Sequence, residues 1–480
     1  MNKNEDLNKT ALKAGFFYVL TQLMVRGITF LTTPVYTRLV STEQFGQLRV
    51  YESWMLILVP LMSLGLYRGV ERAKYDFLDH YDGYVSSTHA LSYFSITVFL
   101  GLFIVFYKDI IAFFELNGFL FTFMFLYIFS YTSTMFYQRR EKQKMQYKNV
   151  TIITVATMLP ATLLSIGCLY WGNATGHKDI LVELRVLGYY LPQIIVGFIL
   201  AIIITKQGKT IFDKDSWKYG LAFSVPLIPE LLSIQIMNQS DKIMIQKMVG
   251  FESAGIFALG TTVSFIMWII EESVWNAWLP WLYEKITRGE KKDIERPWLI
   301  IVTGFAIITF LIVLIAPEII LVLGGEQYRD AAYLVAPMTL GTLFRFFSYI
   351  YSAMQNYYKK TKYVAIGTIG AMIINLILNY VCIRQFGYMA AAYTTAFSYL
   401  LLMFFQAFLE RLITGEIIVP LWKMLLFSSG LTIACLLTMQ LFSVHWIVRW
   451  MGAIIVILVF FLINKKMILQ CISEKLKRNV

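Results

Sequence analysis

The chain has 480 residues, of which 58% are hydrophobic and 15% charged, and its mean hydropathy is +0.62. Soluble proteins average roughly 45–50% apolar and about 25% charged residues, so this composition excludes a soluble enzyme, a disordered chain and a nucleic-acid-binding domain. The net charge of +12 follows a topological pattern described below, which argues against nucleic acid as a partner. Because the four cysteines and four histidines are scattered and form no CxxC, we expect no disulfide framework, no metal site and no cofactor.

Fourteen apolar runs are long enough to be membrane helices, since a bilayer core of about 30 Å requires about 20 apolar residues in a helix. The sequence therefore predicts an all-α polytopic membrane protein. The longest link, residues 67–87, is too short for a soluble domain, and we interpret residues 67–85 as an interfacial amphipathic helix. In chain order the predicted spans are 13–36, 45–66, 88–107, 116–137, 150–171, 182–205, 219–240, 254–282, 298–322, 331–357, 363–384, 388–409, 421–442 and 446–464.

Lysine and arginine are distributed unevenly between alternate links. If the N-terminus is cytoplasmic, the cytoplasmic segments hold 30 of the 42 basic residues, whereas the outer segments and outer helix ends hold 9. Cytoplasmic loops of membrane proteins carry an excess of lysine and arginine. This pattern predicts a multi-pass protein of the cytoplasmic membrane whose N- and C-termini are both cytoplasmic.

One short motif occurs twice, at an offset of 209 residues. Residues 38–46 and residues 247–255 both read basic-x-Val-x-x-Glu-x-x-Gly. We expect each glycine to bring the following helix close to the loop, and each glutamate to favour the positive end of a helix dipole.

The offset of this motif predicts the organisation of the chain. It divides the sequence into a six-helix lobe at 1–209, a second six-helix lobe at 210–418, and two extra helices with a basic tail at 419–480. An even number of spans gives both lobes the same membrane orientation. Such parallel repeats are related by a pseudo-two-fold axis along the membrane normal and place the substrate site at their interface.

Several charged residues lie near the middle of predicted spans. A charge at that depth costs about 2.5–3.5 kcal/mol on the insertion scale and usually marks a cavity or transport pathway. We expect at least part of this set to line a polar cavity, and the alternative is a structural ion pair, for instance between Arg345 and a glutamate. Because Glu271 and Glu272 point about 100° apart on a helix, they cannot both face the cavity squarely. The set is Arg26, Glu230, Glu271, Glu272 and Arg345.

Two further pairs occur inside predicted spans. Arg49 and Glu52 have the i,i+3 spacing that allows an ion pair on one helix face, with a functional role or as a pair at the membrane interface. Asn375 and Asn379 have i,i+4 spacing, and we interpret them as hydrogen-bonding residues that hold neighbouring helices together.

The seventh predicted span combines two prolines with a charged pair. Pro226 and Pro229 each remove a backbone donor and predict a kink, either a bending gate for alternating access or a static feature. We expect Asp241 and Lys242 to terminate this helix, where they would form a cap or gate or be simply solvated.

The division into six, six and two helices, with glycine-containing loops after the first and seventh, resembles the multidrug/oligosaccharidyl-lipid/polysaccharide (MOP) exporter superfamily. Within it the chain is most similar to the polysaccharide-biosynthesis branch, the Wzx-type flippases of lipid-linked oligosaccharides. The resemblance covers essentially the whole chain. It is carried by TRLVSTEQFGQL (37–48), by Pro226-x-x-Pro229 leading into Asp241-Lys242-Ile-Met-Ile, and by GFESAGIFALG (250–260).

This resemblance implies a flippase of the bacterial inner membrane. Its cargo would be an undecaprenyl-diphosphate-linked oligosaccharide, such as an O-antigen or capsule repeat unit, and a glycan polymerase or glycosyltransferases would be partners. The guanidinium fork matches phosphate oxygens, which makes substrate-binding candidates of Arg26, Arg49 and Arg345. Because the sequence has no Walker A motif, a proton or sodium gradient would drive transport, with coupling candidates Glu230, Glu271 and Glu272.

Other functions are compatible with the same helices. An ion-coupled exporter of small cationic molecules would require an acidic pocket, which the midplane glutamates could supply. A lipid II flippase would use the same scaffold. An enzyme is disfavoured, because the outer loops are short and contain no DxD sequence.

Overall fold

The computed structural model describes residues 3–443, 446–456 and 458. Within these residues the chain consists of α-helices and short 3-10 turns, without a β-strand. Ten of the described helices are long and apolar enough to cross a membrane, or eleven if the bent pair Thr42–Met62 and Leu66–Asp76 is one span. The prediction of an all-α polytopic membrane protein is confirmed.

The helices pack into two units, residues 1–255 and residues 256–480. Packing and sequence repetition are different properties, so the predicted lobes 1–209 and 210–418 and the extension 419–480 stay predictions. The last predicted span, 446–464, reaches beyond the described residues, and its described part from 446 to 456 is helical.

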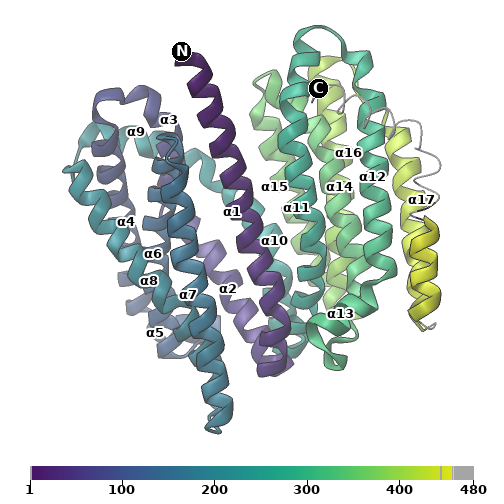
Figure 1. Ribbon diagram of the computed structural model, residues 1–480, viewed down its shortest axis with the longest axis horizontal. Helices are drawn as coiled ribbons and strands as arrows, with labels where there is room; N and C mark the ends of the chain where they lie inside the picture. The colour runs from purple at the N-terminus through teal and green to yellow at the C-terminus, as the bar shows by residue number, and fades with distance from the viewer. Residues whose placement is uncertain (1–2, 444–445, 457, 459–480) are drawn as a thin grey trace. The chain divides into compact units, whose positions relative to one another are not determined.

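The first unit is built around helix α8. Helices α4, α6 and α7 all pack against α8, while α1 packs against α7 and α10 packs against α2 (Figure 1). The helices of this unit are α1 (Lys3–Leu39), α2 (Thr42–Met62), α3 (Gly69–Asp76), α4 (Tyr81–Val105), α5 (Tyr107–Phe114), α6 (Gly118–Gln143), α7 (Tyr147–Ala174), α8 (Leu181–Gly208), α9 (Lys214–Ser224) and α10 (Ile228–Met248).

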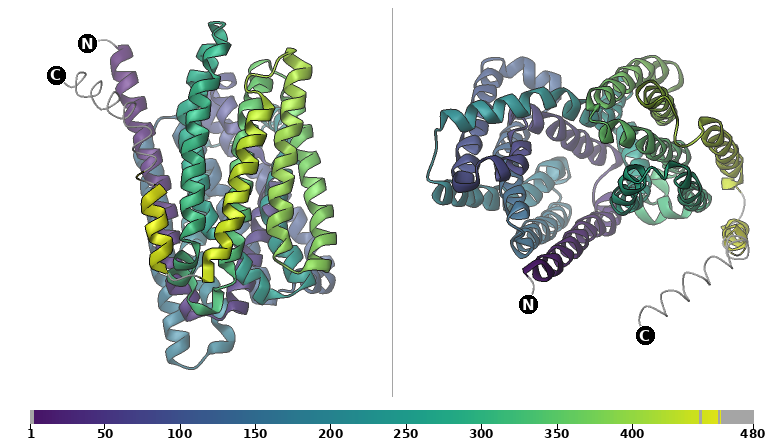
Figure 2. Two further views of the ribbon diagram at one scale, coloured as in Figure 1. Left: turned by 90° about the vertical axis from the view of Figure 1, so that its right-hand side faces the viewer. Right: turned by 90° about the horizontal axis from the view of Figure 1, so that it is seen from above.

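The second unit is built around helix α14. Helices α12 and α16 pack against α14, α15 packs against α16, and α17 packs against α12 and α14. Viewed from above, the long helices within each unit are seen nearly end-on (Figure 2). The helices are α11 (Phe251–Thr287), which begins in the first unit, α12 (Glu295–Leu314), α13 (Ala316–Gly324), α14 (Ala331–Tyr357), α15 (Thr361–Phe386), α16 (Ala390–Thr414) and α17 (Leu421–Gln440).

Two predicted elements are interrupted where the backbone leaves the helical region. Helix α2 ends at Met62, and the chain bends by 70° before Leu66. Leu64 and Gly65 have φ of 53° and 58°, a left-handed conformation that ends an α-helix. The single amphipathic helix predicted for residues 67–85 is wrong, because Phe77, with φ −124° and ψ 49°, separates the short α3 from the turn and helix that follow.

The two copies of the repeated motif each open a helix. In the first copy, the Ser41 hydroxyl accepts a hydrogen bond from the Gln44 backbone N–H (3.1 Å), and the Gln44 side chain accepts one from the Ser41 N–H (3.1 Å). This reciprocal capping box satisfies two backbone donors at the start of α2. The motif glutamates, Glu43 and Glu252, lie in the first turns of α2 and α11, where a negative charge favours the helix dipole.

The glycines of the two copies lie in contact with each other's backbone. A Cβ on Gly46 would lie 1.8 Å from the carbonyl oxygen of Phe251, and one on Gly255 would lie 2.3 Å from the carbonyl oxygen of Thr42. No real Cβ approaches a backbone oxygen so closely. The beginnings of α2 and α11 can therefore pack together only while both positions lack a side chain.

We predict that Gly46→Ala and Gly255→Ala each destabilise the protein by more than about 1–3 kcal/mol, the usual cost of overpacking, because the obstacle here is rigid backbone. Thermal unfolding of the purified protein in detergent checks this prediction. Gly167→Ala, in helix α7, is the control, because nothing lies within 4 Å of its added Cβ. Equal stability of the three variants would contradict the contact.

Candidate functional site

A cavity of about 220 Å³ lies within the first unit, among helices α1, α2, α6, α7 and α8. Its lining includes five tyrosines and three threonines, which come from α1, α6, α7 and α8. Three charged side chains also line it: Arg49 and Glu52 from α2, and Arg185 from α8. These three residues define what we call the arginine cluster.

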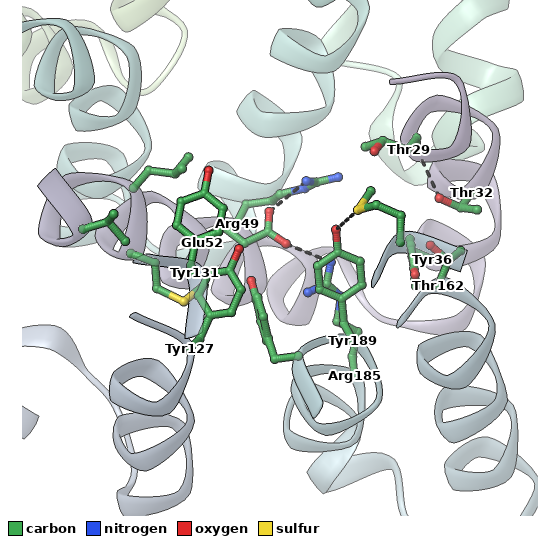
Figure 3. Close-up of a pocket in the computed structure, with 15 residues that line it drawn as sticks. Thr29, Thr32, Tyr36, Arg49, Glu52, Tyr127, Tyr131, Thr162, Arg185 and Tyr189 are labelled. Atoms are coloured by element: carbon green, nitrogen blue, oxygen red, sulfur yellow. Dashed lines mark hydrogen bonds and ion pairs between the residues drawn. The ribbon is translucent and has the colours of Figure 1, made fainter. Parts of the chain in front are cut away.

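Glu52 binds both arginines of this cluster at once. Its Oε2 accepts a hydrogen bond from Arg49 Nη1 at 2.9 Å, and its Oε1 accepts one from Arg185 Nη2 at 2.8 Å. Figure 3 shows the carboxylate between the two guanidinium groups. The predicted i,i+3 pair of Arg49 and Glu52 is therefore confirmed, and the structure adds Arg185 from a second helix.

Arg185 is held among aromatic rings and is almost completely buried, with 6% of its surface exposed. Its guanidinium carbon lies 4.2 Å from the ring centroid of Tyr189 and 5.4 Å from that of Tyr36. Its Nη1 is buried and has no hydrogen-bond partner among the described residues. A buried unsatisfied donor is costly, so the cluster lacks one acceptor, and its two cations exceed its one anion.

Helix α10 adds a third cation beside this cluster. The amide oxygen of Gln239 accepts hydrogen bonds from the Ser53 hydroxyl (3.0 Å) and from Lys242 Nζ (2.6 Å), which ties α10 to α2. Lys242 is near enough to Arg49 and Glu52 to interact with both electrostatically. The expectation that Asp241 and Lys242 terminate their helix is wrong, because α10 continues to Met248.

A second cavity, of about 350 Å³, lies within the second unit between α11 and α14. On its wall Glu271, 1% exposed, forms a bidentate ion pair with Arg345, with Nη2 to Oε2 at 2.8 Å and Nε to Oε1 at 3.3 Å. Trp268, Trp275 and Tyr349 also line this cavity. The predicted alternative of an ion pair between Arg345 and a glutamate is confirmed.

The other charges predicted near mid-span lie in different surroundings. Glu272 is exposed and lines the second cavity beside the buried Glu271, so the two adjacent carboxylates meet different environments. Arg26 is half-buried on α1, three residues before the cavity-lining Thr29. Glu230 is half-buried in the first turn of α10 and lines neither of the two cavities described here.

At the predicted kink the structure has a short 3-10 turn inside one span that runs from Lys214 to Met248. A 3-10 turn, Val225–Leu227, separates α9 from α10, and both prolines lie at or next to it. In the second unit, Asn375 donates a hydrogen bond to Thr395 (2.9 Å) and Asn379 binds Thr394, which connects α15 to α16 as expected for interhelical polar residues.

Arg185 is the member of the cluster that sequence reasoning missed. It lies near the start of a predicted span, where a basic residue resembles an ordinary topological anchor. The indication in the sequence was weak. Glu52 lies within a predicted span, and its i,i+3 spacing indicates a pair with one arginine, Arg49. A partner on α8, 133 residues away, cannot be read from spacing along one helix.

We predict that Arg345→Leu destabilises the protein by about 3–5 kcal/mol, because it leaves the buried Glu271 without its partner, and that the double variant Glu271→Leu/Arg345→Leu recovers most of this loss. Chemical unfolding in detergent micelles measures both. The control is Arg329→Leu, which removes an exposed pair with Glu326 and should cost at most about 1 kcal/mol. Additive effects of the two leucine substitutions would contradict the coupling.

Comparison with solved structures shows the same fold. A lipid II flippase, MurJ, in an inward closed conformation is similar with a TM-score of 0.67 and 14% identity, over 94% of this chain and 99% of that chain. An inward-facing multidrug resistance MATE transporter of the MOP superfamily is similar with a TM-score of 0.61 and 12% identity, over 83% of this chain and 98% of that chain.

Sequence comparison gives two relatives from Haemophilus influenzae. An uncharacterized membrane protein is 24% identical over 339 residues, which cover 69% of this chain and 80% of the relative. The Lsg locus putative protein 1 is 22% identical over 334 residues, which cover 67% and 78%. The family described as polysaccharide biosynthesis protein matches residues 11–286, more than half of the chain. The chain therefore belongs to the polysaccharide biosynthesis protein family, and its fold is similar to those of MurJ and of a MATE transporter.

Proposed function

We propose that this protein is a flippase that translocates a polyprenyl-diphosphate-linked oligosaccharide, such as an O-antigen or capsule repeat unit, across the bacterial inner membrane. The observation that carries the proposal is the arginine cluster. Its two guanidinium groups face one carboxylate, and Arg185 Nη1 is buried without an acceptor among the residues that the structure describes. A diphosphate supplies both the missing negative charge and the missing acceptor oxygens.

The remainder of the first cavity suits a carbohydrate. Tyrosine and threonine hydroxyls both donate and accept hydrogen bonds, as sugar hydroxyls do. The tyrosine rings also offer flat apolar faces, and Tyr127, Tyr131 and Tyr189 lie around the cluster (Figure 3). A cargo with an anionic linker and neutral hydroxylated sugars therefore matches the two kinds of surface that this cavity presents.

Transport would be coupled to a proton or sodium gradient, as in an antiporter. Glu271 is occupied by Arg345, whereas Glu272 is exposed to the second cavity, which makes Glu272 the first carboxylate to test and leaves Glu230 as the next. Arg26 and Arg345 remain candidates for contact with cargo. The 3-10 turn at Val225–Leu227 supports a hinge role for Pro226 and Pro229, with Asp241 and Lys242 as gate residues beyond it.

A lipid II flippase is the second candidate, because lipid II also carries a diphosphate between a polyprenyl chain and sugars and the fold resembles the MurJ structure. The two candidates share the polyprenyl diphosphate and differ in the headgroup attached to it. In either case both termini would be cytoplasmic, membrane lipids would surround the protein, and a glycan polymerase or glycosyltransferases would be its partners.

We predict that cells lacking this protein accumulate lipid-linked oligosaccharide in the cytoplasmic leaflet and that wild-type protein restores its outward transfer. Arg185→Gln should reduce transfer by about tenfold or more, because a charged hydrogen-bond partner of the diphosphate is lost. Leaflet labelling of the glycan measures the transfer. Arg38→Gln, an exposed arginine near the end of α1, is the matched control and should transfer normally.

Three outcomes would change the assignment. Absence of accumulation would contradict a flippase. Accumulation of lipid II instead would select the second candidate. Full activity of a well-expressed Arg185→Gln variant would remove the arginine cluster from cargo binding, and Arg26→Ala would then become the next variant to measure.

A further inference from the structure

We propose that Glu52 is an internal counter-anion, which occupies Arg49 and Arg185 while the cavity is empty and is displaced by the diphosphate of the cargo. This inference rests on the proposed function and adds a mechanism for tuning affinity at the same site. Under the proposed function the arginines bind the cargo. The new element is that Glu52 competes with the cargo for these arginines.

The geometry gives Glu52 the position of a substitute for phosphate. Each of its two oxygens binds a different guanidinium group, at 2.9 Å and 2.8 Å, as two oxygens of a bridging phosphate group would. The arginines come from two helices, and the carboxylate connects them through these two bonds. The Glu52 side chain is 21% exposed, and Glu52, Arg49 and Arg185 all line the cavity, so an incoming anion would meet the same three side chains.

The charge balance indicates why an internal anion is needed. Two arginines with a lysine nearby would repel one another in a cavity of low dielectric constant. Asp241 interacts with Lys242, and Glu52 binds both arginines, so the two guanidinium groups still exceed the one carboxylate bound to them. The exchange of a carboxylate for a diphosphate keeps both existing hydrogen bonds and adds an acceptor for Arg185 Nη1.

This exchange limits how tightly the cargo binds. The cargo forms hydrogen bonds with the arginines but must first break the bonds that Glu52 makes to them. Its net binding free energy is therefore smaller than its own contacts alone would give. The displaced carboxylate remains near Lys242, which already interacts with it electrostatically. A carrier that must release its cargo on the opposite face benefits from such moderate affinity, since a tightly held intermediate would slow release.

The test measures binding of inorganic pyrophosphate to the purified protein in phosphatidylcholine nanodiscs by isothermal titration calorimetry. We expect Glu52→Gln to bind pyrophosphate about tenfold more tightly than wild type, or more, because the competing charge is removed. Glu43→Gln, an exposed glutamate in the first turn of the same helix, should match wild type. Arg185→Gln should abolish binding with or without the Glu52 substitution.

Unchanged or weaker binding by a folded Glu52→Gln variant would overturn the proposal, because a purely structural glutamate cannot increase affinity when it is removed. If that variant does not fold, Glu52→Asp replaces it. Aspartate keeps the charge, but its side chain is shorter by one methylene and competes less well for the arginines. Tighter pyrophosphate binding is therefore expected again, and unchanged or weaker binding would again overturn the proposal.

Two further arms identify the source of the anion and separate this proposal from the flippase assignment. Undecaprenyl diphosphate should compete with pyrophosphate, whereas phosphatidylglycerol added to the nanodiscs should not; the reverse result would make the ligand an ordinary lipid headgroup and overturn the inference. Normal flipping by wild type with no affinity gain in Glu52→Gln refutes the counter-anion alone. An affinity gain without flipping activity in wild type refutes the flippase alone.

Discussion

The bridging of two arginines by Glu52 is the interaction on which the first cavity depends. Guanidinium groups that have lost most of their water require acceptors, and an apolar helical bundle offers few. The polypeptide supplies one carboxylate from the same helix as Arg49, one turn away, and this carboxylate also reaches Arg185 on α8. The tyrosines around Arg185 add ring faces that stabilise a cation. Glu52 thus neutralises part of the charge of the two arginines, and the arginine cluster keeps a net positive charge.

The second unit also contains an arginine that needs an acceptor, but its arginines and bound carboxylates occur in a different ratio. There Arg345 and Glu271 neutralise each other completely, in the bidentate geometry that suits burial. An additional carboxylate, Glu272, also lines the second cavity. Arginine–carboxylate pairing is therefore common to both cavities, with two arginines on one carboxylate in the first and one arginine on one carboxylate in the second.

Features that depend on neighbouring residues along the chain could be predicted from the sequence. Long apolar runs predicted membrane helices, and the i,i+3 spacing predicted the pair of Arg49 and Glu52. Features that depend on contacts between distant helices could not. The partner of Glu52 on α8 lies 133 residues away, and a basic residue near a helix end has an ordinary explanation in membrane topology. Likewise, the left-handed backbone at Leu64 and Gly65 interrupts a segment whose composition favours a continuous helix.

The hydroxyl lining of the first cavity has a consequence for the evolution of its cargo. A hydroxyl group can both donate and accept hydrogen bonds, so tyrosine and threonine side chains can meet a sugar hydroxyl in either role. Under the proposed function, the diphosphate common to all such lipids would be fixed by charge, while the sugars would meet an adaptable surface. Cell-surface glycans could then diversify under selection from hosts or viruses, with few compensating changes in the protein that carries them.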